Sequence, residues 1–149
     1  MPFHIFVCHS TSERVVEELL RCLTTGDIVA TVADRELKFG DSLSTKTEKS
    51  LREADAVLAI LTREGAAGSY VNQEVGIANA VGTPVIAIAE AGMDINSVQI
   101  AEDYIKLDLG EPAPWANALQ ARLRKLPVAN DAQNAIWFAV VCAARELRW

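Results

Sequence analysis

Short apolar runs that alternate with helical periodicity are the feature that most constrains the fold of this chain. They occupy residues 5–8, 28–33, 56–61 and 85–89. Strands that are buried on both faces of a parallel sheet have this pattern. Residues 104–109 instead alternate apolar with polar side chains, which predicts a half-exposed strand at the edge of the sheet.

Segments with helical signals lie between these runs. Apolar residues repeat at helical spacing from Val15 to Leu23, and Ser10 with Glu13 matches a capping box in front of them. Strands that alternate with helices at this spacing favour an α/β fold, in which helices cover both faces of one doubly wound parallel sheet. Further helices are predicted at residues 45–54, 70–81 and 115–126 and from Asp131 onward.

The length of 149 residues suits one domain with one core. We assign residues 1–128 to that domain and residues 129–149 to a C-terminal apolar helix. Such a helix is seldom left facing water, so we expect it either to pack on the domain beside Trp115 and Leu119 or to pair with its twin in a dimer. An ordinary covering helix needs an apolar stripe only ~100° wide, so the greater width here favours the dimer. The apolar residues are Ile136, Trp137, Phe138, Val140, Val141, Ala143 and Ala144.

The composition argues against several classes of function. Fourteen basic and twenty acidic residues give a net charge of −6, which disfavours nucleic-acid binding through the phosphate backbone. The longest apolar run, residues 135–144, falls well short of the ~20 residues that a membrane-spanning helix needs, and the N-terminus shows no secretory signal. Cys8, Cys22 and Cys142 lie in apolar segments and indicate small buried thiols in a reducing compartment. We therefore expect a cytoplasmic protein with neither a nucleic-acid nor a membrane partner.

Glu74 is the most unusual residue of the helix predicted at residues 70–81. Projection of that helix at ~100° per residue places Glu74 in the middle of its apolar face, near Val71 and Ala78. Burial of a lone charge is costly, so this carboxylate needs a partner, a cavity or a chemical role. The alternative to a chemical role is a structural glutamate that is salt-bridged near the favourable N-terminus of the helix.

The carboxyl ends of the predicted strands form a second candidate region, because ligands of doubly wound sheets bind there. His9 and Ser10 end the first strand, and a polar loop begins at Asp34 after the second. Small polar groups in front of a helix N-terminus suit phosphates, whereas Ser10 is also accounted for as a simple helix cap.

Other sites are not predicted. His4 and His9 are too few for a metal cluster, and Cys8 points to the face of its strand opposite to His9. The glycine-rich residues 65–68 lack the Lys-Ser/Thr that follows a phosphate-binding loop. A response-regulator receiver would need acidic residues after the first strand and an aspartate after the third, where this chain has Cys-His-Ser and Leu-Thr-Arg.

Five blocks of sequence form a recognisable set. The blocks are Phe-Val-Cys-His-Ser at residues 6–10, Asp-Arg-Glu-Leu-Lys-Phe-Gly-Asp-Ser-Leu at 34–43, Asp-Ala-Val-Leu at 55–58, Ser-Tyr-Val-Asn-Gln-Glu-Val at 69–75 and Gly-Thr-Pro-Val-Ile at 82–86. Taken together, they resemble the bacterial Toll/interleukin-receptor (TIR) domains in order and spacing. The resemblance covers roughly residues 4–110 and implies a flavodoxin-like parallel sheet of five strands in the order 2-1-3-4-5.

The resemblance also implies a site. The family's catalytic glutamate falls on Glu74, and the loop from Asp34 to Leu43 corresponds to the BB loop, which commonly mediates assembly and borders the active site. Catalytic members often have Trp four residues before the glutamate, where this chain has Tyr70, and the usual aromatic residue near the end of the second strand is absent. Stacking on nicotinamide or adenine would then come from Tyr70, Phe39 or a neighbouring subunit. The implied substrate-binding residues are His9, Ser10, Asp34, Phe39 and Tyr70.

The function implied by the resemblance is cleavage of the nicotinamide–ribose bond of NAD. NAD is then the substrate, no cofactor is required, and the product is ADP-ribose or a cyclic ADP-ribose-type signal. A stand-alone bacterial TIR domain suits antiphage defence together with a separate effector protein that senses the product, and it self-associates through the BB loop, with the C-terminal helix as a second candidate contact. Two alternatives are a non-catalytic TIR scaffold that signals through BB-loop assembly and an N-glycosidic transferase that acts on nucleosides.

Overall fold

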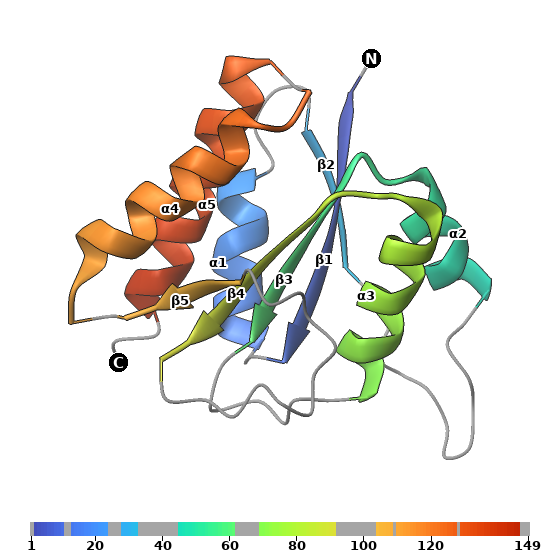
Figure 1. The fold of residues 1–149 in the computed structure, drawn as a ribbon, viewed down its shortest axis with the longest axis horizontal. Helices are drawn as coiled ribbons and strands as arrows, with labels where there is room; N and C mark the ends of the chain where they lie inside the picture. The colour runs from blue at the N-terminus through green and yellow to red at the C-terminus, as the bar shows by residue number, and fades with distance from the viewer. Residues whose placement is uncertain are drawn as a thin grey trace.

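The computed structural model describes residues 2–10, 13–23, 28–32, 45–61, 69–91, 104–108, 110–127 and 129–146. Five strands form one parallel sheet in the order β2-β1-β3-β4-β5 (Figure 1). The predicted fold class and strand order are therefore confirmed. The strands are β1 (Phe3–Ser10), β2 (Ile28–Val32), β3 (Ala56–Leu61), β4 (Val85–Glu90) and β5 (Ile105–Leu107).

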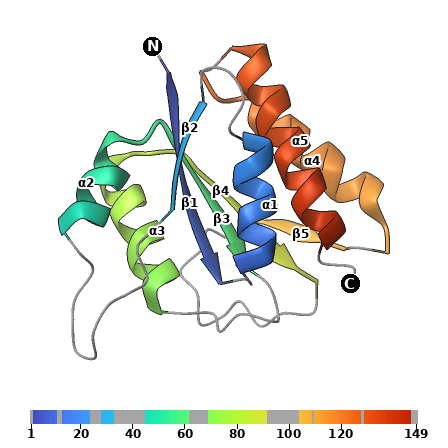
Figure 2. The same cartoon turned by 180° about the vertical axis from the view of Figure 1, so that it is seen from behind.

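Helices cover both faces of the sheet. One face carries α1 (Glu13–Leu23), α4 (Pro112–Arg124) and α5 (Asn130–Glu146), and the other carries α2 (Thr45–Glu53) and α3 (Ser69–Val81) (Figures 1 and 2). Each face has its own apolar core, and we call them the α1-side core and the α3-side core after the helix that covers the centre of each face.

The interior strand β1 contributes to both cores by alternation. Ile5 and Val7 are buried in the α1-side core, whereas Phe6 and Cys8 are buried in the α3-side core. Successive side chains of a strand point to opposite faces of the sheet, so a continuous apolar run is what a strand covered on both sides requires.

The two ends of the sheet differ from its centre. The prediction that β2 is buried on both faces is wrong, because β2 is an outer strand in which Ile28 is buried while Val29 and Thr31 are exposed. All six residues of β3 are buried. In β5, Ile105 and Leu107 are buried while Lys106 between them is exposed, so the predicted half-exposed edge strand is confirmed. In the described part of the sheet β5 is an outer strand that pairs with β4 alone, and such edge strands commonly keep one face towards solvent.

Helix boundaries agree with the predicted segments to within a few residues. The largest difference is at α4, which begins at Pro112, three residues before the predicted start at Trp115. Proline suits the first turn of a helix, where its missing N–H has no intrahelical partner to lose. The capping box predicted for Ser10 and Glu13 cannot be assessed, because their side chains lie outside the described residues.

The C-terminal end of α3 is closed by a glycine cap. Gly82 has φ +81°, and its N–H donates to the carbonyl of Asn79 at 3.3 Å while Thr83 N–H donates to the carbonyl of Ala78 at 2.9 Å. These two bonds form a Schellman motif, which satisfies carbonyls at the end of the helix and turns the chain into β4.

Helix α5 packs on the domain. Ile136, Ala139 and Val140 are buried in the α1-side core together with Trp115 and Leu119 of α4. Trp137 Nε1 also donates to the carbonyl of Ala116 at 3.4 Å. The apolar width of this helix is therefore largely used between α1 and α4, and dimerisation through α5 stays a prediction. Within the described part of the chain, no helix has the length and apolar character to span a membrane.

Candidate functional site

Glu74 lies on the face of α3 that packs against the sheet. Its side chain has no exposed surface, and Val71 one turn before it and Ala78 one turn after it are equally buried in the α3-side core. Residues three and four apart in a helix share one face, so Glu74 occupies a core position, as the helical projection predicts. The carboxylate is engaged in its surroundings by a polar or electrostatic interaction.

The strands beneath α3 carry small side chains. Ala59 of β3 and Ala87 and Ala89 of β4 belong to the α3-side core. Because protein interiors are closely packed, small residues on the strands leave volume for a longer side chain on the covering helix. This arrangement lets a glutamate, rather than an aliphatic residue, occupy the inner face of α3.

Glu74 also lies close to the carboxyl edge of the sheet. Register pairs Ser10 with Leu61 and Leu61 with Ala89, so β1, β3 and β4 end together at one edge. Helix α3 follows β3 in the chain and begins beside that edge (Figure 1). Glu74 is the sixth residue of α3, and at 1.5 Å per residue it lies only about 7.5 Å along the helix from its start. The carboxylate is thus placed where doubly wound sheets bind their ligands.

His9 lies at the same edge but is directed to the other face. Alternation along β1 places its half-buried side chain on the side of Ile5 and Val7, whereas Cys8 shares the α3 side with Phe6. The predicted opposition of Cys8 and His9 is therefore confirmed. The sheet separates His9 from Glu74, and the two could share a ligand only above the strand ends.

Comparison with known proteins identifies the family. The family model described as "TIR domain" matches residues 5–124. This chain belongs to the TIR domain family. No curated protein matches it. Among solved structures, the TIR domains of the activated Roq1 resistosome, which directly recognises the pathogen effector XopQ, superpose with a TM-score of 0.45 at 17% identity, over 96% of this chain and 84% of that one.

The other predicted substrate-binding residues of this TIR domain lie at the ends of the segments that the structure describes, or outside them. Tyr70 lies in α3 one turn before Glu74, and Ser10 is the last residue of β1. The side chains of both lie outside the described residues, as do Asp34 and Phe39 of the BB loop altogether. Their substrate-binding roles therefore stay predictions.

A surface pocket of about 300 Å³ lies away from this edge. Most of its lining comes from the turn between α3 and β4 and the residues beside it, together with Val75 of α3, Ala87 of β4 and Arg122 of α4. The lining residues are Val75, Asn79, Gly82, Thr83, Pro84, Val85, Ala87 and Arg122. Although its volume reaches the lower limit for small-molecule sites, it lies at the amino end of β4 rather than at the carboxyl edge of the TIR sheet. We assign it no part in the site around Glu74.

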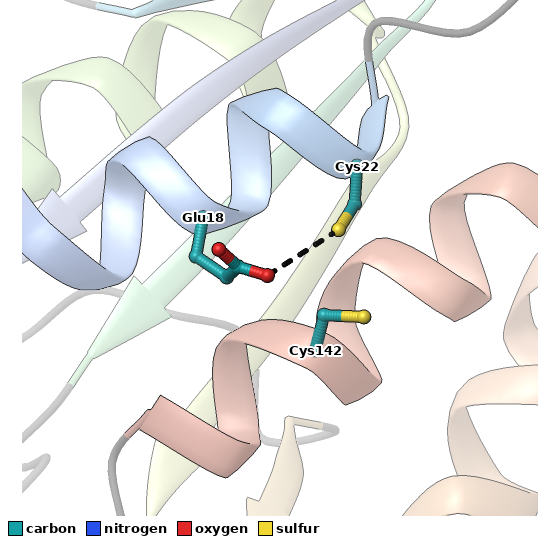
Figure 3. A group of neighbouring side chains, drawn as sticks. All are labelled: Glu18, Cys22 and Cys142. Carbon is teal, nitrogen blue, oxygen red and sulfur yellow. Dashed lines mark hydrogen bonds between the residues drawn. The ribbon is translucent and has the colours of Figure 1, made fainter.

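One group of potential metal ligands was not predicted from the sequence. Glu18 and Cys22 of α1 and Cys142 of α5 bring one carboxylate oxygen and two sulfur atoms within 4.8 Å of one another (Figure 3). Burial is the main factor that raises the pKa of the Cys22 thiol, to about 11, and Cys142 beside it acts in the same direction. The four-residue spacing of Glu18 and Cys22 is a weak signal, because it does not show that a cysteine more than a hundred residues later packs against them.

Proposed function

We propose that this TIR domain cleaves the nicotinamide–ribose bond of NAD and that Glu74 is its catalytic residue. The observation that carries the proposal is the complete burial of a carboxylate on the inner face of α3, about 7.5 Å from the start of that helix. Desolvation of a carboxylate costs free energy. A buried carboxylate that is kept near the carboxyl edge of the sheet, where ligands bind, therefore indicates a functional role. The family's catalytic glutamate falls on the same position.

The chemistry needs a fixed negative charge more than it needs an acid. Loss of nicotinamide leaves positive charge on the ribose in an oxocarbenium-like transition state. A preorganised carboxylate beside the ring stabilises that charge and orients the ribose hydroxyls, and its effect is larger in a site from which water is excluded. Nicotinamide is already a good leaving group, so a single marked carboxylate suffices.

The fate of the ribosyl cation decides the product. Capture by water yields ADP-ribose, whereas capture by a nucleophile within the same molecule yields a cyclic ADP-ribose-type signal. In the second case a separate effector protein would sense the product, which suits a role in antiphage defence.

We propose that assembly completes the site. Tyr70 and Phe39 are the candidate aromatic surfaces for nicotinamide or adenine. His9 and Ser10 are the last two residues of β1, and Asp34 is the second residue after β2 in the sequence. Phe39 also belongs to the segment that the resemblance assigns to the BB loop, and an apolar ring exposed in such a loop would serve self-association. Substitution of Phe39 by Asp is expected to reduce NAD turnover and assembly together.

Replacement of Glu74 by Gln tests the proposal directly, because the amide keeps the size of the side chain and removes its charge. We expect NAD turnover by Glu74→Gln to fall by about 100-fold or more, the range seen when a group that stabilises transition-state charge is removed. The measurement is the rate at which the purified protein converts NAD, with products identified by mass, and the thermal midpoint should stay within a few degrees of wild type.

The matched control is Glu111→Gln. Glu111 is an exposed carboxylate before α4 whose side chain makes no capping hydrogen bond, so turnover should not change. Wild-type turnover by a folded Glu74→Gln protein would contradict the catalytic role, and unfolding of that variant would instead support a structural glutamate.

A non-catalytic TIR scaffold is the second candidate function. It is favoured by Tyr70, which stands where catalytic relatives often have Trp. A folded wild-type protein that assembles but does not consume NAD would support this alternative.

A further inference from the structure

We propose that Glu18, Cys22 and Cys142 form a Zn²⁺ site that links α5 to α1. The proposal is independent of the NAD-cleaving function, because these residues lie on the α1 side of the sheet and Glu74 lies on the α3 side. Figure 3 shows the three side chains beside one another where α1 and α5 meet, with Cys22 Sγ directed to the Glu18 carboxylate.

The distances are close to those of a bound ion. Zn–S bonds of about 2.3 Å and Zn–O bonds of about 2.1 Å place neighbouring ligands of a tetrahedral Zn²⁺ about 3.6–3.8 Å apart. Cys22 Sγ lies 3.8 Å from Glu18 Oε1, and all three ligand atoms lie within 4.8 Å of one another. Ion binding therefore requires movements of about 1 Å or less, which side-chain rotations can supply.

The ligand types select the metal. Two thiolates with one carboxylate suit Zn²⁺, which accepts both sulfur and oxygen, whereas Mg²⁺ and Ca²⁺ prefer oxygen alone. Both cysteines are free thiols. Binding of the ion replaces one proton on each thiol, and the two protons leave to solvent.

Solvent exposure on one side leaves room for a fourth ligand. The Glu18 side chain is 23% exposed and Cys142 is half-buried, whereas Cys22 is buried. A water molecule can therefore complete the tetrahedron from the outer side, as in zinc sites that keep an open position.

Arg21 holds the carboxylate in position. Its Nε donates to Glu18 Oε2 at 3.2 Å, and its guanidinium also donates to Oε1. When Glu18 Oε1 turns to the ion, Arg21 Nε can stay hydrogen-bonded to Glu18 Oε2. Arg21 then acts as an outer partner that orients the carboxylate ligand.

The place of the site gives the ion a structural role. Cys142 lies in α5, which packs against α1 in the α1-side core, so a bound Zn²⁺ would join the C-terminal helix to the first helix of the domain. Binding to the folded chain alone raises its stability by mass action. We therefore expect the thermal midpoint to rise with Zn²⁺ concentration.

Titration of the full chain with Zn²⁺ under a phosphine reductant tests the site. We expect one Zn²⁺ per chain, measured by competition with a chromophoric chelator, and Cd²⁺ should produce the ultraviolet absorption of two thiolate ligands. Cys142→Ser and Cys22→Ala should abolish stoichiometric binding. Loss of an outer partner weakens metal binding about 10–100-fold, so Glu18→Gln, which removes a direct ligand, should weaken it at least tenfold.

Two controls separate the site from other thiols and carboxylates. Glu17→Gln changes an exposed neighbour on the same helix, and Cys8→Ala removes the thiol of the α3-side core, so both should bind Zn²⁺ like wild type. Circular dichroism confirms that each variant is folded. Absence of stoichiometric binding by the reduced, folded wild type would overturn the proposal, and so would unchanged binding and Cd²⁺ absorption in folded Cys142→Ser.

Discussion

The two faces of the sheet are built differently. Among the described residues, the α1-side core contains 23 buried apolar residues, whereas the α3-side core contains 11, of which four are alanines. The smaller core nevertheless accommodates the fully buried Glu74, while the larger one is completed by an additional helix, α5.

This difference separates stability from function. Buried apolar area is the main source of folding free energy, so the α1-side core contributes most of it. A desolvated carboxylate has the opposite effect, because removal from water penalises its charged form. The larger core can therefore offset the cost of keeping Glu74 at the ligand edge, as is common where active sites reduce stability.

Truncation of a buried leucine in each core should have the largest effect on stability. Leu19 and Leu51 are both fully buried, one in each core, and buried Leu→Ala substitutions cost about 2–5 kcal/mol. We expect Leu19→Ala to lie in the upper part of this range and Leu51→Ala in the lower part, because the nine-residue α2 can shift to fill the cavity. Urea denaturation measures the free energy of unfolding of both variants, with exposed Val29→Ala as the control. A larger loss of stability for Leu51→Ala than for Leu19→Ala would contradict the conclusion that the α1-side core contributes more to stability.

Replacement of Glu74 by Met should raise the free energy of unfolding by about 1 kcal/mol. An apolar side chain of similar length removes the desolvation cost and fills the same volume, and we expect this gain to exceed the loss of the interaction that the Glu74 carboxylate makes. Thermal and urea denaturation compare the variant with wild type, and NAD turnover should be lost in the same protein. If Glu74 were instead a structural member of a buried ion pair, removal of one partner would cost about 3–5 kcal/mol, and such a loss would contradict the functional explanation.

Gly82→Ala should lower the free energy of unfolding by about 1 kcal/mol. No atom lies within 4 Å of the position of an added Cβ, so the cost comes from the positive φ of +81° rather than from a clash. Gly76→Ala is the matched control, since that glycine lies within α3 with equally open space and should gain stability from the higher helix propensity of alanine. Equal changes in the free energy of unfolding for Gly82→Ala and Gly76→Ala would contradict a stabilising role of the glycine cap of α3.

Phe138→Ser should change association more than stability. Phe138 is 56% exposed on the outer side of α5, so its loss should alter the free energy of unfolding by no more than about 0.5 kcal/mol. If α5 forms a dimer contact, light scattering should detect dissociation, whereas exposed Asn134→Ser on the same helix should leave the molecular mass unchanged. A Phe138→Ser protein that keeps the mass of a wild-type dimer would place the contact elsewhere.

This surface substitution is a cleaner test than deletion of residues 131–149, which would also remove Ile136 from the core.

Much of the architecture follows from local patterns. Continuous apolar runs predicted four of the strands, alternation around Lys106 predicted the edge strand, and helical projection predicted the burial of Glu74. These signals depend on residues close together in the chain, because the periods of strands and helices are local properties. The predicted helix at residues 115–126 did not include the start of α4 at Pro112, where proline fits the first turn of a helix.

The sequence by itself determined the parallel α/β fold and the placement of a carboxylate on an apolar helix face. Only the tertiary structure decided which distant residues meet. It buried α5 between α1 and α4, it put His9 and Glu74 on opposite sides of the sheet, and it brought Cys142 to Glu18 and Cys22. The physical reason is that the direction in which one helix packs on another depends on the shapes of both surfaces, and neither surface is encoded in the periodicity of a single segment.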